Sequence, residues 1–119
     1  MPEELKPVLS RQMEVYVGFI EYTDFHIERL VDAIEGLRAF ENTLVYYIIG
    51  GNGASTEGGI NDTFSEMLHF NNMQDLETPE YLIKHLEDLG GHDSYSHYAV
   101  SWAHAMDTPY QWTKQIASY

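Results

Sequence analysis

The stretch that decides the fold is "LVYYIIGGNGASTEGG", residues 44–59. Residues 44–49 form a continuous apolar, β-branched and aromatic run, and a glycine-rich loop follows it directly. A short apolar run bounded by glycine is typical of a strand buried on both faces, as in a parallel sheet. We therefore predict a strand over 44–49, with the loop of residues 50–63 at its carboxyl end, where α/β proteins place ligands.

Helices are predicted on both sides of this strand. Apolar residues recur every three or four positions between 8 and 37, which indicates a long amphipathic helix. Thr78–Pro79 has the residue types that begin a helix, and Gly90 has the type that ends one. The residues after Thr108–Pro109 are also predicted to be helical, whereas residues 63–70 fit either a short helix or irregular structure.

The chain is short enough to form one domain at most. Its 119 residues are predicted to make a single partial domain spanning 1–119. Only one convincing strand is present, although a parallel strand needs neighbours. The predicted fold class is an α/β-derived fragment, rich in helix, with one or two short strands. Because an uncovered apolar strand associates readily, we expect a homo-oligomer in which self-association covers the strand and the helix at 8–37.

Composition limits the partners and the cell compartment. The chain has 19 acidic and six basic residues, a formal charge of −13. Nucleic acid and anionic membrane surfaces are therefore not expected as partners. No apolar run is long enough to span a membrane, and the start lacks the features of a signal peptide, so a cytoplasmic location is the default expectation. Without cysteine, disulfides and thiolate metal ligands are excluded.

Two groups of residues could bind a metal ion. Asn52 follows the predicted strand and offers an amide oxygen suited to a hard cation such as Ca²⁺, but the pattern alone favours a role in the turn itself. The loop around it matches neither the dinucleotide-binding fingerprint nor the P-loop. His92, Asp93 and His97, with His104 further on, have the short spacing of zinc ligands. The alternative is that these histidines are separate, each held by its own hydrogen bonds.

Lys114 is the only basic residue after Lys84 and follows an aromatic segment. Its ammonium group could hold an anion as a point charge. Alternatively, its aliphatic stem could cover Trp112 while the charge stays in solvent.

Three longer strings carry a family resemblance. They read "LVYYIIGGNGASTEGGINDTFSEM" (44–67), "ETPEYLIKHLEDLGG" (77–91) and "HYAVSWAHAMDTPYQWTKQIAS" (97–118). They resemble an internal segment of bacterial arylsulfatases, in the formylglycine-dependent sulfatase family, and the resemblance covers essentially the whole chain. It implies an alkaline-phosphatase-like α/β fold and calcium-dependent hydrolysis of sulfuric esters, with aryl sulfate esters as the substrate class. Met1 would then correspond to an internal methionine of a longer protein.

The resemblance also implies roles for individual residues. The family's strand-end motif is Asp-Asn-Gly, whose Asp and Asn bind calcium, and the corresponding residues here are Gly51, Asn52 and Gly53. Asn52 is retained as a vestigial calcium ligand, but Gly51 has lost the charged one, so no tightly bound calcium is expected. The pair Thr113–Lys114 matches the family pair whose lysine contacts the sulfate group.

The family's nucleophile motif has no counterpart in this chain. In the family a formylglycine is made from the first residue of Cys/Ser-x-Pro-x-Arg. This chain has no cysteine, and the required Pro and Arg follow none of its serines, which are Ser10, Ser55, Ser65, Ser94, Ser96, Ser101 and Ser118. We therefore predict that the isolated chain is inactive as a sulfatase.

Two alternatives to an inactive sulfatase segment stay open. One is a self-associating binding or scaffold module that retains a weak anion or cation site at Asn52 and Lys114. The other is a hydrolase that uses the cluster of His92, Asp93 and His97, although no established catalytic motif is present there.

Overall fold

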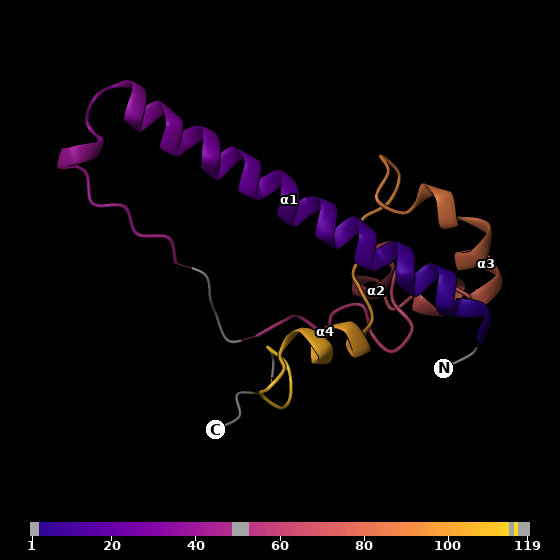
Figure 1. Cartoon of the computed structure of the whole chain (residues 1–119). Coiled ribbons are helices and arrows are strands. Elements are labelled where there is room, and N and C mark those ends of the chain that lie inside the picture. Colours follow the sequence, from indigo (N-terminus) through magenta and orange to yellow (C-terminus); the bar gives the residue numbers. More distant parts are fainter. Residues whose placement is uncertain (1–2, 49–52, 115, 117–119) are drawn as a thin grey trace.

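The computed structural model describes residues 3–48, 53–114 and 116, and these parts consist of helices, turns and irregular segments (Figure 1). Two isolated β-bridges, Thr63–His97 and Ser65–Tyr95, are the only strand-like pairings among these residues. The α-helices are α1 (Lys6–Gly36), α2 (Glu66–Phe70), α3 (Pro79–Lys84) and α4 (Val100–Met106), and short 3-10 helices cover Glu3–Leu5, Phe40–Asn42, Gln74–Leu76 and Leu86–Asp88.

The long helix predicted over 8–37 is confirmed by α1. It begins at Lys6, and Pro7 occupies its first turn, where the missing N–H group costs little. Other parts of the chain bury only the start of α1, where the buried residues are Val8, Leu9 and Gln12. In Figure 1 the rest of α1 extends away from the other helices.

The hydrophobic core lies at the N-terminal end of α1. Leu5 and Val8 pack there with Phe64, Leu82 and Leu89, and all five are almost completely buried. Tyr81 and Leu86 pack against this cluster. The core therefore joins the start of α1 to α3 and the segment before α2.

The helix predicted to begin at Thr78–Pro79 is confirmed by α3. The Thr78 hydroxyl accepts a hydrogen bond from the Tyr81 N–H group, 3.3 Å away, which satisfies one of the free donors of the first turn. The α-helix ends at Lys84, and a 3-10 turn continues to Asp88. Gly90 was predicted to end this helix, but α3 ends six residues earlier; Gly90 instead follows the 3-10 turn with a φ of +82°, a conformation that favours glycine.

The strand predicted over 44–49 is wrong in its described part. Residues 43–48 form no strand, and Ile49 lies outside the described residues. A strand is defined by hydrogen bonds to a neighbour, and nothing in the described part of the chain lies alongside this run to supply them. Its side chains are correspondingly exposed, from 46% for Val45 to 86% for Ile48.

The helix predicted after Thr108–Pro109 is also wrong. The last helix, α4, ends at Met106, before this pair, and residues 108–114 form turns and bends. The Tyr110 N–H group donates to the carbonyl oxygen of Asp107, 2.9 Å away, so the chain turns back on the end of α4. Trp112 then has a φ of +72°, which the interior of a right-handed helix does not accommodate.

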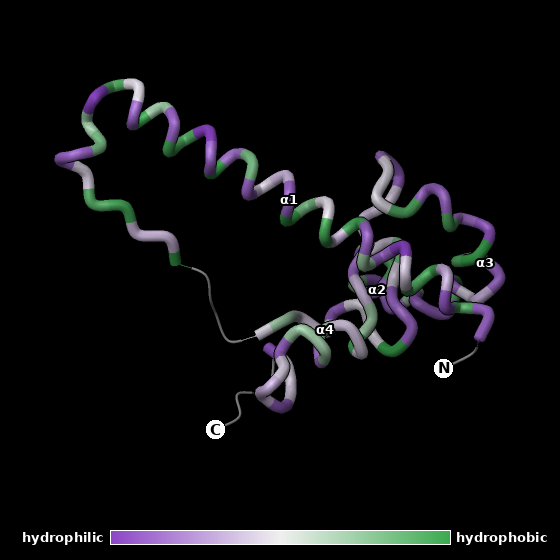
Figure 2. Tube along the Cα trace, in the orientation of Figure 1, coloured by the Kyte–Doolittle hydropathy of each residue, from purple (hydrophilic) through white to green (hydrophobic). Residues whose placement is uncertain are grey.

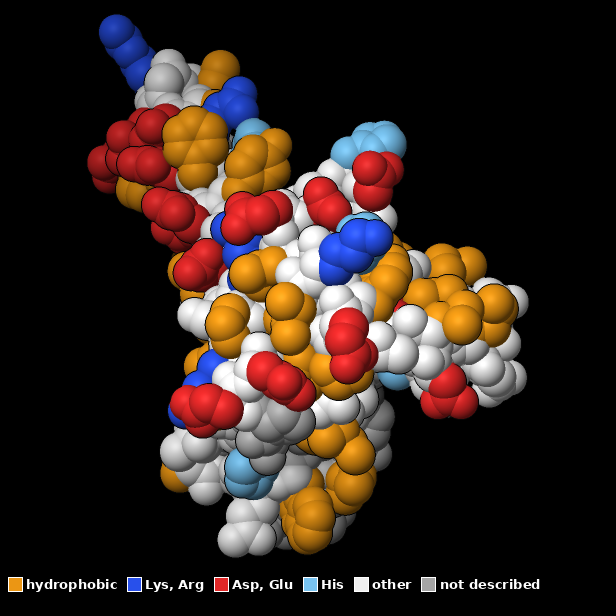
Figure 3. Space-filling view, turned by 90° about the vertical axis from the view of Figure 1, so that its right-hand side faces the viewer, with side chains coloured by type: hydrophobic (Ala, Val, Ile, Leu, Met, Phe, Trp, Pro, Cys, Tyr) orange, Lys and Arg blue, Asp and Glu red, His pale blue; other side chains and the backbone are white. Residues whose placement is uncertain are grey.

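The second half of α1 and the run after it form a projecting arm, residues 17–48, which we call the α1 arm. Figure 2 shows hydrophobic residues along it, and Figure 3 shows hydrophobic side chains exposed among many acidic ones. The radius of gyration is 17.9 Å, compared with roughly 13–14 Å for a compact domain of this length. Despite its length, α1 is too polar to cross a membrane, and no other described helix qualifies.

Candidate functional site

The glycine-rich loop is held by the residue that follows α4. The Ala54 N–H group donates a hydrogen bond to Asp107 Oδ1, 2.7 Å away. Gly53 has a φ of +105°, and a Cβ atom there would lie 2.9 Å from the same carboxylate oxygen. The left-handed backbone conformation is what favours glycine at position 53, and the nearby Asp107 carboxylate leaves little room for a larger residue.

The loop also contacts the segment that carries Lys114. The Lys114 N–H group donates to the carbonyl oxygen of Ala54, 2.9 Å away, and the Lys114 side chain is exposed. Ala54 is thus bonded on its N–H side to Asp107 and on its carbonyl side to Lys114. Gly51 and Asn52 lie outside the described residues. Lys114 is bonded to Ala54, which is two positions after Asn52 in the sequence.

Tyr98 contacts the next residue of the loop. Burial raises the pKa of Tyr98, the neighbouring Tyr16 adds to the increase, and a hydrogen bond with the backbone of Ser55 opposes it. The Tyr98 ring packs edge-on against Tyr16 of α1, with 5.1 Å between the ring centroids. Tyr98 therefore stays a neutral hydroxyl that links the loop to α1.

The described residues do not fit a tight calcium site at this loop. Ca²⁺ binds six to eight oxygen atoms, usually with more than one carboxylate. Asp107 is the carboxylate that contacts the loop; its Oδ1 is engaged by Ala54, and its Oδ2 is buried without a hydrogen-bond partner. Gly51 has no side chain to add, and nowhere in the described ranges do three His, Asp or Glu side chains gather as metal ligands.

The histidines proposed as metal ligands are held separately. His92 is almost fully exposed, and its Nδ1 lies 2.8 Å from Asp93. His97 Nε2 lies 3.1 Å from Glu66 Oε2, close enough for an ion pair but without the angles of a hydrogen bond. His104 is exposed on α4. The geometry therefore favours the alternative reading, in which these histidines do not form a metal centre.

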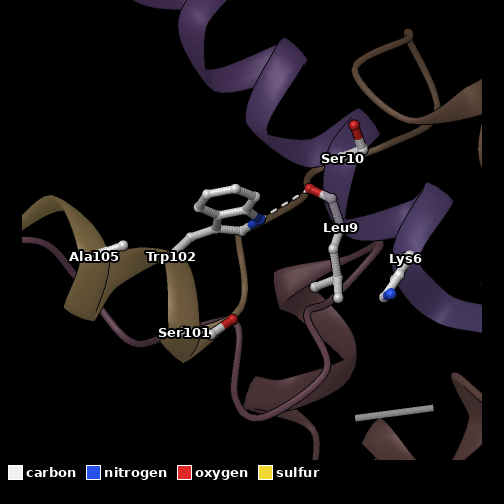
Figure 4. A pocket seen from close by; sticks show the side chains of 6 residues that line it. All are labelled: Lys6, Leu9, Ser10, Ser101, Trp102 and Ala105. Atoms are coloured by element: carbon white, nitrogen blue, oxygen red, sulfur yellow. Dashed lines mark hydrogen bonds between the residues drawn. The ribbon is translucent and has the colours of Figure 1, made fainter. Parts of the chain in front are cut away.

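A hollow of about 310 Å³ lies between the start of α1 and α4 (Figure 4). Trp102 Nε1 donates to the carbonyl oxygen of Leu9, 2.9 Å away, which fixes α4 on α1. The hollow is mostly apolar, and its charged group, Lys6, pairs with Glu3 at 2.7 Å. Its lining shows no constellation suited to a sulfate ester; it consists of Lys6, Leu9, Ser10, Ser101, Trp102 and Ala105.

Asp107 and Tyr98 were not anticipated as site residues. Both act through contacts with residues far away in the sequence, so no local spacing marks them. Asp107 has one weak signal, its position directly before Thr108–Pro109, because aspartate is common where a helix gives way to a turn.

Comparison with known proteins gives a consistent assignment. The model of the sulfatase family matches residues 2–115. An uncharacterised sulfatase of Schizosaccharomyces pombe (strain 972 / ATCC 24843) is 30% identical over 112 residues, which cover 93% of this chain and 18% of that protein. The chain thus spans less than a fifth of that relative's length, and no solved structure matches it significantly. Since the family model covers nearly every residue, the chain belongs to the sulfatase family.

Proposed function

We propose that this chain supplies one wall of a sulfate-ester site and binds the anion without hydrolysing it. The observation that supports this proposal is the 2.9 Å hydrogen bond between Lys114 N and the Ala54 carbonyl oxygen. This bond connects two segments that the family resemblance singles out. One carries the lysine that resembles the family's sulfate contact, and the other is the loop that resembles the family's calcium-binding turn. An ammonium group binds a sulfate as a compact point charge.

Absence of turnover follows from the residue types present. Formylglycine needs a cysteine or serine in the sequence Cys/Ser-x-Pro-x-Arg, and this chain contains no such motif. Removing the nucleophile removes the covalent route itself rather than a fraction of the rate. We also propose that calcium has no tight site at the loop, because Gly51 carries no carboxylate and Asp107 Oδ1 is engaged by the Ala54 N–H group.

Nuclear magnetic resonance can test the binding part of this proposal. Inorganic sulfate is added to the ¹⁵N-labelled chain at constant ionic strength, and the backbone amide shifts are followed. We expect saturable shifts at Ala54 and Lys114, which are lost in Lys114→Gln and retained in Lys84→Gln, a matched change at another exposed lysine. Shifts that survive Lys114→Gln, or that respond equally to chloride, would contradict the proposed site.

A binding module that is not selective for sulfate is the second candidate. It is favoured by the same contacts, because a lysine and a glycine-rich loop hold many anions. Phosphate titrated in parallel at pH 8, where both anions are largely dianions, distinguishes the two. A sulfate-selective site should bind sulfate more tightly than phosphate, whereas a general anion-binding module should bind both alike.

We further propose that the chain self-associates through the α1 arm, with a second copy as the occupant of its apolar surface. Contiguous exposed apolar patches mark interaction surfaces, and an unpaired apolar run next to a long helix is a ready template for association. The exposed large side chains of the arm are Val17, Phe19, Ile20, Tyr22, Phe25, Leu30, Leu37, Phe40, Leu44, Val45, Tyr46, Tyr47 and Ile48.

A further inference from the structure

One face of the α1 arm carries a seven-residue repeat, which we call the α1 seam. Its residues follow one another at alternating spacings of three and four, so they lie on one stripe of the helix. They are Ile20, Thr23, Ile27, Leu30, Ile34 and Leu37. Thr23 is the polar member, but its hydroxyl group donates to the carbonyl oxygen of Phe19, 2.9 Å away, and is satisfied within the helix.

The α1 seam is bare in the described structure. Ile20, Leu30 and Leu37 are 47%, 62% and 78% exposed. Ile27 and Ile34 are partly exposed. Figure 1 shows this part of α1 standing clear of the other helices. A helix with such a stripe is normally stabilised by burying it against another apolar surface.

The seam continues a face of α1 that is already covered at its start. Leu9 and Tyr16 lie seven residues apart on the same stripe, just before the seam. Leu9 is buried, and its carbonyl oxygen accepts a hydrogen bond from Trp102 Nε1, 2.9 Å away. The Tyr16 ring packs edge-on against Tyr98, with 5.1 Å between the centroids. Residues 98–102 thus cover this face as far as Tyr16 and leave the seam uncovered.

The glutamates of the arm lie beside the seam and not on it. Glu21, Glu28 and Glu35 recur at the same seven-residue interval, each directly after a seam isoleucine. A shift of one residue turns a side chain by roughly 100° around a helix. The charge of −13 therefore acts on an approaching copy from a distance, but no carboxylate lies in the seam itself.

Given the self-association proposed for the α1 arm, we propose that two copies pair along the α1 seam as an antiparallel helix pair. A stripe with spacings of three and four interlocks with a second stripe of the same kind. Its partner must cover about 25 Å, the length of helix from Ile20 to Leu37. Apart from α1, no helix among the described residues is longer than seven residues. The occupant is therefore α1 of a second copy.

The antiparallel direction follows from what covers the start of α1. Packed helices lie about 8–10 Å apart. In a parallel pair, residues 98–102 of both copies would meet at the same level and fill the space between the helices. In an antiparallel pair they lie at opposite ends. Ile27 then lies against Leu30 of the second copy. Ile20 likewise lies against its Leu37, so both seams are used along their whole length.

Cysteine cross-linking tests the pairing, because the chain contains no cysteine of its own. In the proposed register Thr23 lies against Ile34 of the second copy, within the Cα separation of about 4–7 Å that a disulfide bridges. The two copies of position 34 are eleven residues apart along the axis, about 16 Å. Thr23→Cys and Ile34→Cys are purified separately, mixed and oxidised. We expect a mixed disulfide dimer, identified by its mass, and no disulfide dimer from either variant alone.

Two further variants test the seam without cross-linking. Leu30→Asp places a carboxylate in the seam and should weaken the dimer Kd at least about tenfold. Phe25→Asp changes a similarly exposed side chain that lies off the seam, 53% exposed against 62%, and should leave the Kd unchanged. Circular dichroism checks that α1 stays helical in both variants.

Three results would overturn the α1 seam. A disulfide dimer of Ile34→Cys with itself would mean a parallel pair. An oligomer that Leu30→Asp and Phe25→Asp weaken equally would mean association through the wider surface of the arm, so that self-association stands and the seam fails. A wild type that sediments as a monomer at every concentration and salt would remove both. Lys114→Gln should leave the cross-linking unchanged, so this test is independent of sulfate binding.

Discussion

At the scale of single residues, two aspartates decide how the loops meet the helices. Asp107 supplies a hydrogen-bond acceptor to Ala54, which ties the glycine-rich loop to the end of α4. Asp62 has both oxygens buried without partners. The first carboxylate therefore stabilises the fold, whereas the second destabilises it whenever it is charged and uncompensated.

Replacing Asp107 by alanine should loosen the loop. The partly buried Ala54 N–H group would lose its acceptor, which costs about 1–2 kcal/mol. Amide hydrogen exchange at Ala54 should therefore accelerate by about tenfold or more in Asp107→Ala. Asp107→Asn keeps the side-chain oxygen and should exchange more slowly than the alanine variant. Unchanged exchange at Ala54 in Asp107→Ala would contradict the role of this contact.

Replacing Asp62 by asparagine should change how stability depends on pH in metal-free buffer. The folded-state pKa of Asp62 is about 7, against 3.8 for an unperturbed aspartate. A raised pKa means that the folded state binds the proton more tightly, so its stabilisation is fully present below about pH 4 and is lost as the pH rises through 7. At about 1.36 kcal/mol per pKa unit, the loss is about 4 kcal/mol.

Denaturant unfolding at several pH values measures this loss. Asp62→Asn should be more stable than the wild type at pH 8, and its stability should vary less between pH 4 and 7. The unpaired Asp62 is the charged group involved, with Glu77 facing it and Gln12 beside it. A wild type whose stability is constant across this range would refute the assignment.

Sequence analysis missed both aspartates for the same reason. Asp107 bonds to Ala54 and Asp62 lies against Gln12, so each depends on contacts that only the folded chain creates. Asn52 and Lys114 were first singled out by their positions in the sequence, and the family resemblance then gave them roles and added Gly51. Of these, only Lys114 lies in the described residues, where its N–H group donates to the carbonyl oxygen of Ala54; its role in binding sulfate stays a prediction.

At the scale of the elements, periodicity was informative and apolar runs were not. The three-to-four spacing over 8–37 predicted α1 because a helix satisfies its backbone groups locally, whatever surrounds it. The run over 44–49 predicted a strand, which needs a partner from elsewhere, and its described residues have none. The same composition is therefore compatible with a paired strand or with an exposed segment.

The two Thr-Pro pairs provide a matched test of helix capping. Thr78→Ala removes the acceptor of the Tyr81 N–H group and should lower the free energy of unfolding by about 1 kcal/mol. Thr108→Ala should have a much smaller effect, because no helix begins at that pair. Denaturant unfolding of both variants checks this difference. Equal losses would mean that Thr78 does not act as a cap.

At the scale of the whole molecule, charge and exposed apolar surface oppose each other. The charge of −13 repels a second copy, whereas the apolar side chains of the α1 arm favour association. The small core at one end of α1 leaves this arm without cover. Association should therefore depend strongly on the screening of charge.

Sedimentation velocity should show this dependence. Raising NaCl from about 50 mM to about 500 mM shortens the screening length several-fold and should increase the fraction of oligomer. Ile48→Asp, at a side chain that is 86% exposed, should reduce association, while Ile60→Asp, at one that is 79% exposed outside the arm, should not. A monomer at every salt concentration would contradict assembly through the arm.

The central claim is that this member of the sulfatase family binds a sulfate group without turning it over. Hydrolysis of a chromogenic aryl sulfate by the purified chain, with Ca²⁺ added and the oligomeric state measured on the same sample, tests it most directly. We predict no product above the buffer rate, because the chain carries neither cysteine nor the serine motif from which formylglycine is made. Turnover that disappears in Lys114→Ala would contradict the claim and require another nucleophile in this chain.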